Sequence, residues 1–415
     1  MTPAGEKLTP QPWMQTATVK AVLAALAAAP GTSRFVGGCV RNALLGREVE
    51  DIDIATTHTP EAVVALLEKA GLRAAPTGIE HGTITAVANG HPYEITTLRR
   101  DVSTDGRRAV VAYTDDWKED AARRDFTMNA LYADADGTLY DPAAGLGDLK
   151  AGRVRFIGDP KQRIAEDYLR ILRFFRIHAA YGAGELDRAG LSACAAAKDE
   201  LKRLSGERIQ KEMLKLLALD EPVSTLRAMA ASGVLPEIMP GALNFPRFER
   251  LAGIERDQFF TSDAVLRLAS LMTRVDQAKA LAARWRLSVR DSERIAAVLG
   301  ASFRVVSYLS IREVRRLLYR EGVALFKDVA MLRWAEDPKI QNDIPWRALL
   351  AMADSWVRPK FPLTGDDVMH ARVPPGPLVG HVLKEVEDWW VEADFIDDPF
   401  SIAERLKAVA QAVAP

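Results

Sequence analysis

The pattern of hydrophobic residues changes near residue 150, and this change constrains the fold more than any other feature of the sequence. Before residue 150, short runs rich in β-branched residues alternate with helical runs. After it, segments such as QRIAEDYLRILRFFRI (162–177) and ERIQKEMLKLL (207–217) repeat apolar residues every three or four positions, as amphipathic helices do. The sequence therefore predicts an α+β protein, in which a small mixed sheet with helices is followed by an all-helical remainder.

Turn and capping signals divide the first 150 residues into elements. Asn89-Gly90 is a strong signal for a tight turn, and it predicts a hairpin over 83–98. Thr59 followed by Pro60 predicts the start of a helix that runs to about residue 70. The other expected elements are helices at 15–29, 39–46 and 116–133, strands at 34–38 and 50–56, and a glycine-rich hinge at 141–152.

The length and the cysteine content limit the class of protein. A chain of 415 residues is too long for one core and indicates two to four domains. Two cysteines do not suggest an oxidising compartment, and no apolar run is long enough to span a membrane. We therefore expect a soluble cytoplasmic protein.

The net charge of −1, from 55 basic and 56 acidic side chains, at first argues against a nucleic-acid partner. The charges are not spread evenly along the chain, however. Residues 151–215 contain 14 Lys or Arg and 9 Asp or Glu, which is a net charge of +5. A locally basic region for RNA is therefore compatible with the balanced total.

Two aspartates, Asp51 and Asp53, are separated by one residue within an expected strand. Side chains alternate along a strand, so both carboxylates leave the same face. One or two Mg²⁺ ions would relieve the repulsion between them and could activate an attacking hydroxyl. Glu94, on the second strand of the expected hairpin, could complete a metal-binding triad. The alternatives are an exposed acidic edge for the aspartates and a solvated strand face for Glu94.

A glycine turn precedes the aspartates. Gly37-Gly38 ends one expected strand and opens a short helix that carries Arg41. Glycines at such a turn let backbone N–H groups approach a phosphate, and a helix N-terminus favours an anion. A lone glycine pair is more often only a tight turn. Its combination with Arg41 and with Asp-x-Asp on the next strand is much rarer, and it indicates a phosphate cradle beside a metal site.

These residues lie in segments that resemble a known family. GGCVRNALL followed by DIDIAT resembles motif A of the polymerase-β-type nucleotidyltransferases, and more closely that of the class II tRNA nucleotidyltransferases and bacterial poly(A) polymerases. Motifs B to E of that family are similar, in order, to RRDFTMNAL (123–131), DPAAGLGDLKAGRVRFIGDP (141–160), AEDYLRILRFFRI (165–177) and SGERIQKEMLKLL (205–217). The resemblance implies a seahorse-shaped enzyme with an N-terminal helix (1–30), a catalytic nucleotidyltransferase head (31–150), a neck for base recognition (151–217), a helical body (218–355) and a helical tail that binds tRNA (356–415).

The resemblance also implies a role for each matching residue. By the resemblance, Asp51 and Asp53 are catalytic and would hold the Mg²⁺ ions, two in number. Glu94 is expected as the third catalytic carboxylate from its place on the hairpin. The triphosphate would be bound by Gly37, Gly38 and Arg41, and the ribose by Arg124, Asp125 and Asn129, which would lie on about one and a half turns of helix. Asn42 stands where the family usually has Asp, and its carbonyl is expected to orient Arg41.

The resemblance implies that Asp167 and Arg170 read the base, because the family uses these two positions as a protein template for CTP and ATP. The two residues are three apart and would share a helix face. A carboxylate acceptor and a guanidinium donor together match the Watson–Crick edges of cytosine and adenine, but not those of guanine or uracil. Arg173 is expected to support Arg170, Glu166 to face elsewhere, and Arg208 to brace the neck against the body. An ordinary surface salt bridge is the alternative.

Segment 99–111 is polar and aperiodic, and it is expected to be a mobile loop. It resembles the flexible loop of those family members that add the terminal adenosine. The residues of interest in it are Arg100, Asp101 and Arg107. A solvated hairpin extension is the alternative for this segment.

The expected function is that of a CCA-adding tRNA nucleotidyltransferase, which uses CTP and ATP to extend the tRNA 3′ end without a nucleic-acid template. The terminal 3′-hydroxyl would attack the α-phosphate, and pyrophosphate would leave. The body and tail would grip the acceptor and TΨC arms through phosphates. The alternatives are a poly(A) polymerase or A-only enzyme of the same family, a non-catalytic RNA-binding relative, and a small-molecule nucleotidyltransferase. No membrane or protein partner is implied, and the oligomeric state stays open.

Overall fold

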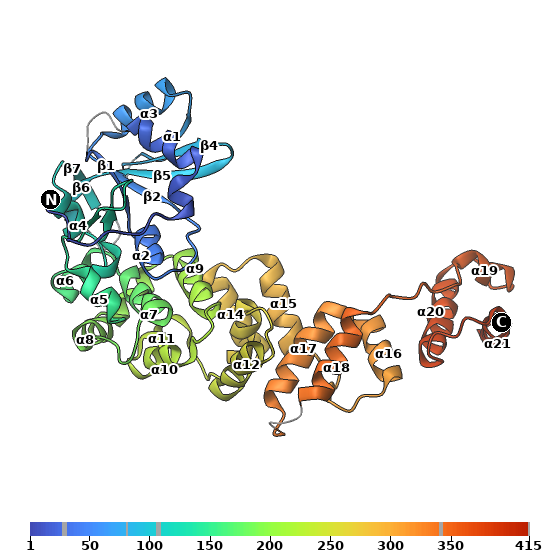
Figure 1. Ribbon diagram of the computed structural model, residues 1–415. Helices are drawn as coiled ribbons and strands as arrows, with labels where there is room; N and C mark the ends of the chain where they lie inside the picture. The colour runs from blue at the N-terminus through green and yellow to red at the C-terminus, as the bar shows by residue number, and fades with distance from the viewer. Residues whose placement is uncertain (27–30, 80–81, 105–108, 340–342, 414–415) are drawn as a thin grey trace. The chain divides into compact units, whose positions relative to one another are not determined.

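The computed structural model describes residues 1–26, 31–79, 82–104, 109–339 and 343–413. The chain forms two compact units, Met1–Gly241 and Ala242–Pro415. Among the described residues, all strands lie in the first unit, and the elements that follow Lys150 are helices (Figure 1). The predicted α+β fold, with a mixed N-terminal region followed by helices, is therefore confirmed.

A seven-stranded sheet forms the centre of the first unit, with the strands in the order β3-β4-β5-β2-β1-β8-β9. Strands β2 and β5 run parallel, and the other neighbours run antiparallel. Strand β2 therefore lies in the middle of the sheet. The strands are β1 (Ser33–Val36), β2 (Asp53–Thr56), β3 (Arg73–Gly78), β4 (Thr83–Ala88), β5 (His91–Thr97), β8 (Tyr132–Ala133) and β9 (Leu139–Tyr140).

The local signals around this sheet act as expected. Asn89 and Gly90 both have positive φ angles, 48° and 80°, and they turn β4 into β5, so the predicted hairpin is confirmed. The Thr59 side chain accepts a hydrogen bond from the Ala62 N–H at the start of α3 (Pro60–Lys69). Helices α1 (Ala17–Leu26) and α3 pack on each other and on the β4 side of the sheet, and α2 (Gly38–Leu44) follows β1.

The segment 116–133 is not one helix, which corrects the expectation. Helix α4 (Trp117–Ala122) ends early, and the short 3₁₀ helix η3 (Thr127–Asn129) leads into β8. The Asp125 side chain accepts a hydrogen bond from the Phe126 N–H at 2.8 Å, and this local bond competes with the helical pattern. Asp125 and Asn129 therefore lie on a turn and a 3₁₀ helix rather than on a continuous α-helix.

The segment 141–152 contains helix α5 (Gly145–Lys150) rather than an open hinge. The Asp141 carboxylate accepts hydrogen bonds from the N–H groups of Gly145 and Leu146, at 2.6 and 2.9 Å, and so caps this helix. A Cβ atom on Gly145 would lie 2.1 Å from the Thr127 carbonyl oxygen. The glycine therefore allows α5 to pack directly on the backbone of η3.

The remaining helices of the first unit pack around α7 (Leu169–Tyr181). Phe174 on α7 contacts Phe156 and Phe126, with ring centroids 5.4 and 6.3 Å apart, and this cluster joins α7 to the segment before η3. The other elements here are α6 (Pro160–Glu166), α8 (Arg188–Ala196), η4 (Lys198–Arg203), α9 (Gly206–Leu217), α10 (Val223–Ala231) and α11 (Val234–Ile238).

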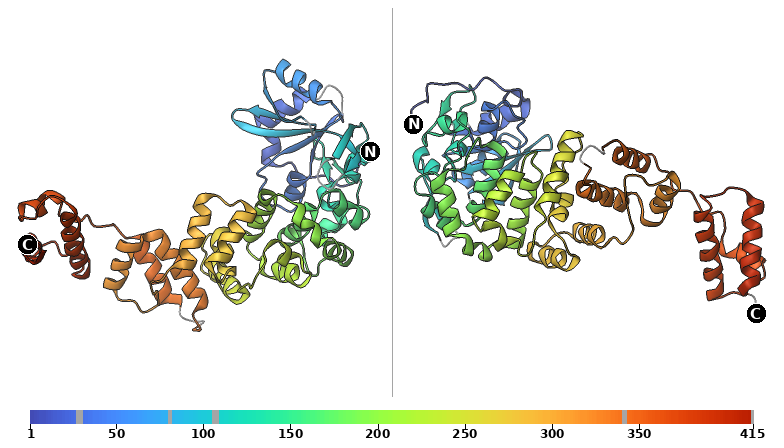
Figure 2. Two further views of the ribbon diagram at one scale, coloured as in Figure 1. Left: turned by 180° about the vertical axis from the view of Figure 1, so that it is seen from behind. Right: turned by 90° about the horizontal axis from the view of Figure 1, so that it is seen from below.

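The second unit is built from helices around buried aromatic residues. Trp334 stacks on Trp346 with ring centroids 6.5 Å apart, and Trp390 packs edge-on against Tyr319. Figure 2 shows these helices from two further sides. They are α12 (Phe245–Asp257), α13 (Ala264–Leu271), α14 (Val275–Trp285), α15 (Val289–Gly300), α16 (Ile311–Glu321), α17 (Val323–Glu336), α18 (Asp343–Asp354), α19 (Gly365–His370), α20 (Pro377–Glu392) and α21 (Pro399–Val413). No helix in the described ranges is both long and apolar enough to cross a membrane.

Candidate active site

Three carboxylates gather where β2 begins. Asp53 is the first residue of β2 and lies directly opposite Glu94 on the parallel strand β5. Asp51 precedes the strand instead of belonging to it, which corrects the expected strand boundary. Burial raises the pKa of the Asp53 carboxyl to about 6, and the negative charges of Glu94 and Asp51 add to this rise. The structure therefore brings the three predicted carboxylates into electrostatic contact.

This cluster suits a cation by its charge. Within the residues that the structure describes, no three His, Cys, Asp or Glu side chains are close enough to form a ready-made metal site. Asp53 nevertheless lies opposite Glu94 across the β2–β5 pair, and a divalent cation would neutralise the charge of two such neighbouring carboxylates. Asp51 and Glu94 are exposed, so their side chains are free to adjust to an ion. The residues present fit the metal that the sequence implied.

The glycine turn lies beside this cluster. Gly37 has a φ of 74° and directly precedes α2, so a residue with a side chain would be strained there. A Cβ atom at Gly37 would lie 3.6 Å from the Asn129 carbonyl oxygen and 3.8 Å from Nη1 of Arg124. The charge of Arg124 also lowers the pKa of Asp53. The turn, Arg124 and the carboxylates therefore form one site.

A buried aspartate, Asp120, holds Arg124 in place. Its carboxylate accepts charged hydrogen bonds from Arg123 at 2.6 Å and Arg124 at 2.8 Å, and one from the Tyr132 hydroxyl at 2.8 Å. Burial opposes the charged form, but the two arginines outweigh it and hold the pKa of Asp120 far below its usual range. Sequence reasoning missed Asp120, although the spacing D-x-x-R-R is a signal for such a pair on a helix.

Arg41 is buried, and it connects the glycine turn to η3. Its Nη1 donates to Oδ1 of Asn129 at 2.5 Å. Its Nε and Nη2 donate to Oδ1 of the neighbouring Asn42, at 3.2 and 2.9 Å. The expectation that the Asn42 carbonyl orients Arg41 is therefore confirmed.

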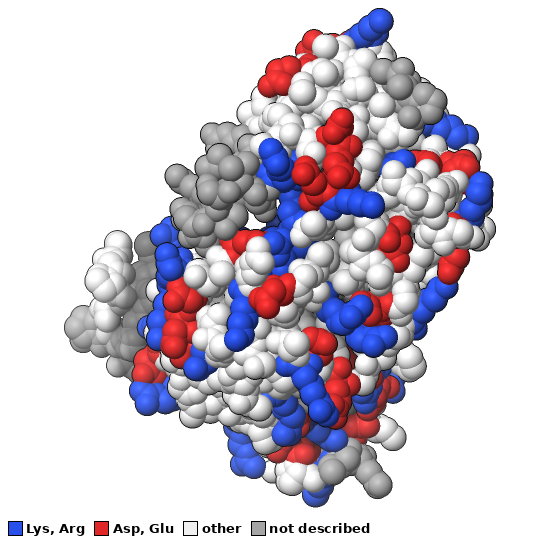
Figure 3. Space-filling model, turned by 90° about the vertical axis from the view of Figure 1, so that its left-hand side faces the viewer, with Lys and Arg blue, Asp and Glu red and all other residues white. Residues whose placement is uncertain are grey.

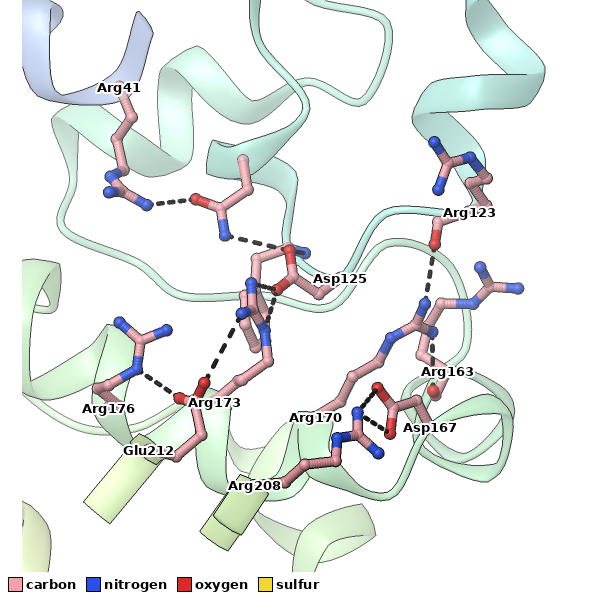
Figure 4. Close-up of polar contacts among 12 residues, drawn as sticks. Arg41, Arg123, Asp125, Arg163, Asp167, Arg170, Arg173, Arg176, Arg208 and Glu212 are labelled. Atoms are coloured by element: carbon pink, nitrogen blue, oxygen red, sulfur yellow. Dashed lines mark hydrogen bonds and ion pairs between the residues drawn. The ribbon is translucent and has the colours of Figure 1, made fainter. Parts of the chain in front are cut away.

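Asp125 is also buried and fully engaged. Its oxygens accept hydrogen bonds from Nδ2 of Asn129 at 3.1 Å and from Arg173, where Nε and Nη2 lie at 2.8 and 2.5 Å (Figure 4). Burial raises the pKa of Asp125, but the Arg173 charge and these hydrogen bonds lower it to about 2. Arg173 also faces Glu212 of α9, 3.9 Å away, and the charge of Asp167 acts on it as well.

The expected helix face shared by Asp167 and Arg170 does not exist. Asp167 ends α6 with an extended backbone, φ −153° and ψ 106°, and α7 begins at Leu169. The Asp167 side chain accepts a hydrogen bond from the Leu169 N–H at 3.1 Å, which favours the break. Its carboxylate is held by Arg208 of α9, with Nη2–O distances of 3.0 and 2.8 Å. Arg208 therefore acts on Asp167 inside the first unit.

Arg170 lies beside this pair but has its own partners (Figure 4). Its Nη1 donates to the Glu166 carboxylate at 2.6 Å and to the Arg163 carbonyl at 2.8 Å, and its Nη2 donates to the Arg123 carbonyl at 2.9 Å. Glu166 also accepts from Arg163. The expectation that Glu166 faces away is therefore wrong, because this glutamate sets the direction of Arg170.

Segment 99–111 pairs as a hairpin where the structure describes it, which agrees with the alternative of a hairpin extension and not with an irregular loop. Strand β6 (Arg99–Thr104) pairs with β7 (Ala109–Tyr113). Arg100 is exposed and lies 4.0 Å from Glu119, and Asp101 lies opposite Val111 in the ladder. Arg107 lies outside the described residues.

The surface around the first unit mixes charges of both signs. Figure 3 shows basic and acidic side chains lying close together over the face in view. Inside the site, the arginines also pair with a carboxylate or a carbonyl; they are Arg123, Arg124, Arg170, Arg173 and Arg208. The site is therefore a set of oriented ion pairs rather than a patch of one sign.

Known proteins share both the sequence and the fold. Residues 33–155 match the family described as "Poly A polymerase head domain", and residues 185–245 match the one described as "Probable RNA and SrmB- binding site of polymerase A". A mouse relative, "CCA tRNA nucleotidyltransferase 1, mitochondrial", is 34% identical over 366 residues, which cover 87% of this chain and 83% of the mouse protein. The "CCA-adding enzyme" of Streptococcus gordonii is 32% identical over 396 residues, which cover 93% and 96% of the two chains.

The solved structure of the Bacillus stearothermophilus CCA-adding enzyme in complex with CTP has the same fold. It aligns with a TM-score of 0.74 and 24% identity, over 96% of this chain and 99% of that one. The Thermotoga maritima CCA-adding enzyme, solved in complex with tRNA, aligns with a TM-score of 0.63 and 19% identity, over 96% and 98%. The chain matches the head-domain family and is more than 30% identical to relatives over most of its length. Its fold is that of the solved CCA-adding enzymes, and it places carboxylates opposite each other on β2 and β5. The chain therefore belongs to the family of CCA-adding tRNA nucleotidyltransferases.

Proposed function

We propose that this protein adds C, C and A to the 3′ end of tRNA from CTP and ATP, without a nucleic-acid template. The observation that carries the proposal is the group of Asp53, Glu94 and Asp51 beside a glycine turn bordered by Arg124. Acidic oxygens and a phosphate cradle at one place are what nucleotidyl transfer requires. The names of the relatives supply the reaction and the tRNA substrate.

The reaction is an attack of the terminal 3′-hydroxyl on the α-phosphate, with pyrophosphate as the leaving group. Asp51 and Asp53, with Glu94 beside them, would hold two Mg²⁺ ions, which when bound supply the positive charge that activates the hydroxyl and stabilises the leaving group. The Gly37 N–H donates to the Leu131 carbonyl at 3.1 Å, so the N–H of Gly38, at the start of α2, is the one placed to face the phosphates. Arg41 and Arg124 would neutralise their charge.

The sugar and the base are read by separate residues. Asn129 lies next to the glycine turn and bonds to Arg41, so it is placed to donate a hydrogen bond from Nδ2 to a ribose hydroxyl. Asp125 would hold Asn129 in that position, because its Oδ1 accepts from the same Nδ2 at 3.1 Å. Asp167 offers carboxylate oxygens and Arg170 offers N–H donors to the Watson–Crick edge of cytosine or adenine. The contacts of Arg170 among the described residues use Nη1 and one N–H of Nη2, which leaves Nε–H and the second Nη2 N–H for a base. Arg173 acts on this site through Asp125.

Other expectations remain part of the proposal. The head (31–150), neck (151–217), body (218–355) and tail (356–415) are retained as functional divisions, and the second compact unit begins inside the proposed body. The body and tail would bind the acceptor and TΨC arms, and Arg100, Asp101 and Arg107 would act in adding the terminal adenosine. A cytoplasmic location is also proposed, although the mouse and human relatives are named as mitochondrial.

One assay tests the proposal. Purified protein with Mg²⁺ and a tRNA that lacks CCA is offered each nucleotide singly and then CTP and ATP together. We expect two C and one A to be incorporated, and no extension with UTP or GTP. The match of the head to a poly(A) polymerase domain makes that activity the second candidate, and continued addition of A would establish it. Addition of A only, to a tRNA ending in CC, would indicate an A-adding enzyme, and no extension under any condition would indicate a non-catalytic relative.

A further inference from the structure

Tyr181 is an aromatic residue that the sequence motifs did not single out, and it covers the Arg41 guanidinium. It is the last residue of α7, on the opposite end of that helix from Arg170. The guanidinium carbon of Arg41 lies 3.7 Å from the centre of the Tyr181 ring. The Tyr181 hydroxyl accepts a hydrogen bond from Nη2 of Arg41 at 2.7 Å. Ring and hydroxyl therefore both act on the same cation.

Asn42 completes this arrangement. Its Oδ1 accepts hydrogen bonds from Arg41 and, at 3.1 Å, from the Tyr181 hydroxyl. Its Nδ2 donates to the Glu48 carbonyl at 2.9 Å. The amide can have only this orientation, because a flip would point its NH₂ group at donors. Asn42 therefore fixes the direction of the Tyr181 O–H and leaves the lone pair of that oxygen for Arg41.

The contacts leave Arg41 little freedom. Of its five N–H donors, Nε–H, both on Nη2 and one on Nη1 have partners at Asn42, Tyr181 and Asn129. Tyr181 is the only one of these three partners that lies on α7. It therefore connects the helix that begins with the proposed base-reading Arg170 to the proposed triphosphate-binding Arg41.

A second arginine strengthens the contact between α7 and the segment after α2. Arg47 lies 4.9 Å from the centre of the Tyr181 ring, and its Nη1 donates to the Ala180 carbonyl at 2.7 Å. A cation at the last carbonyls of a helix is favourable, because these groups carry partial negative charge. The end of α7 is therefore held on the α2 segment by two cations.

We propose that Tyr181 is a positioning residue, which holds the Arg41 guanidinium in the direction needed to bind the triphosphate. The inference rests on the proposed role of Arg41 in that binding. It makes a specific claim: Tyr181 acts on the part of the substrate that CTP and ATP share. Loss of the Tyr181 hydroxyl must therefore weaken the binding of CTP and of ATP by the same factor. The choice between the two bases must stay unchanged.

The test uses the full chain with Tyr181→Phe, which keeps the ring and removes the hydroxyl. Inorganic tripolyphosphate, which has neither base nor ribose, serves as a competitive inhibitor of tRNA extension. We expect Tyr181→Phe to weaken this inhibition by about tenfold or more, the effect of one hydrogen bond to a charged group, and to raise KM for CTP and ATP by the same factor with a smaller change in kcat. Tyr308→Phe is the matched control, because the Tyr308 hydroxyl also binds an arginine, Arg304 at 2.8 Å, in the second unit.

A third variant separates the inference from the proposed function. Arg41→Lys keeps the positive charge but loses the planar set of guanidinium N–H donors. It should weaken inhibition by tripolyphosphate at least as much as Tyr181→Phe does. If Arg41→Lys weakens inhibition by tripolyphosphate and Tyr181→Phe does not, the positioning role of Tyr181 is wrong. If neither variant changes this inhibition, Arg41 does not bind the triphosphate, and the proposed roles of both Arg41 and Tyr181 are wrong. A change in the ratio of CTP to ATP use, or a large drop in melting temperature for Tyr181→Phe, would also overturn the inference.

Discussion

Replacing Gly145 by alanine should distort the site from outside it. Gly145 is buried at the start of α5, and a Cβ atom there would lie 2.1 Å from the Thr127 carbonyl oxygen and 2.5 Å from its carbonyl carbon. Ordinary carbon–oxygen contacts are about 3.3 Å or longer, so one backbone must move by about 1 Å. Gly147, in the same helix, is exposed and has nothing within 4 Å of an added Cβ. The two glycines therefore form a matched pair.

The expected cost follows from what holds the Thr127 peptide. Its N–H donates to the Arg155 carbonyl at 3.0 Å, and its carbonyl accepts from the Ala130 N–H at 3.1 Å. Losing both bonds costs about 2 kcal/mol, and the remaining overlap about 1–3 kcal/mol. Alanine recovers up to about 1 kcal/mol over glycine in a helix. Gly145→Ala should therefore destabilise the first unit by about 2–4 kcal/mol, whereas Gly147→Ala should stabilise it by about 0.5–1 kcal/mol.

Amide hydrogen exchange measures the loss of stability in the first unit alone, whereas unfolding by denaturant would report on both units together. In Gly145→Ala the Ala130 amide should exchange roughly 100-fold faster than in wild type, because a loss of about 3 kcal/mol corresponds to about that factor. KM for CTP should rise as well, since the moved segment includes Asn129. In Gly147→Ala neither quantity should worsen. Equal exchange rates in the two variants would refute the argument that α5 packs on the η3 backbone.

Three further substitutions test the charges and the metal site. Asp120→Asn leaves Arg123 and Arg124 without their shared buried carboxylate, and it should cost about 2–4 kcal/mol at pH 7, measured by hydrogen exchange. Because the pKa of Asp120 is lowered in the folded state, its contribution is full above the unfolded value of about 3.9 and is lost as the pH falls below it, so wild type and variant should converge at low pH. Asp51→Ala should reduce tRNA extension at least roughly 1000-fold while CTP still binds without metal, and extension at the wild-type rate would overturn the metal assignment. Arg170→Ala should relax discrimination against UTP and GTP in single-nucleotide extension assays, and unchanged base choice would show that Arg170 does not read the base.

The carboxylate cluster shows how far sequence reasoning reaches. The turn at Asn89-Gly90 predicted that Glu94 lies on a strand, and it lies on β5. Alternation along a strand predicted that Asp51 and Asp53 share a face, but β2 begins at Asp53, so this argument does not apply to Asp51. The parallel pairing of Asp53 with Glu94 could not be derived in the same way, because it depends on the order of strands in the sheet. Segment patterns determine which elements form, whereas the order of strands depends on tertiary packing.

The break between α6 and α7 shows where the same reasoning failed. Apolar residues continue with helical spacing through 162–177, so periodicity alone predicts one helix. The break arises because the Asp167 side chain bonds to the Leu169 N–H and its carboxylate is drawn to Arg208, which is 41 residues further along the chain. A local signal existed, since aspartate favours helix starts over interiors. The distant partner had no signal in the local sequence.

The arginines of the proposed site are paired with carboxylates. Arg124, Arg170, Arg173 and Arg208 each have a carboxylate partner, respectively Asp120, Glu166, Asp125 and Asp167. A guanidinium held in this way keeps its direction before a nucleotide arrives, so less entropy is lost on binding. Each of these four cations has an anion beside it, so the four pairs together add no net charge to the chain. The net charge of −1 is thus consistent with a site that binds phosphates, since it is the orientation of paired charges, and not their excess, that the structure provides.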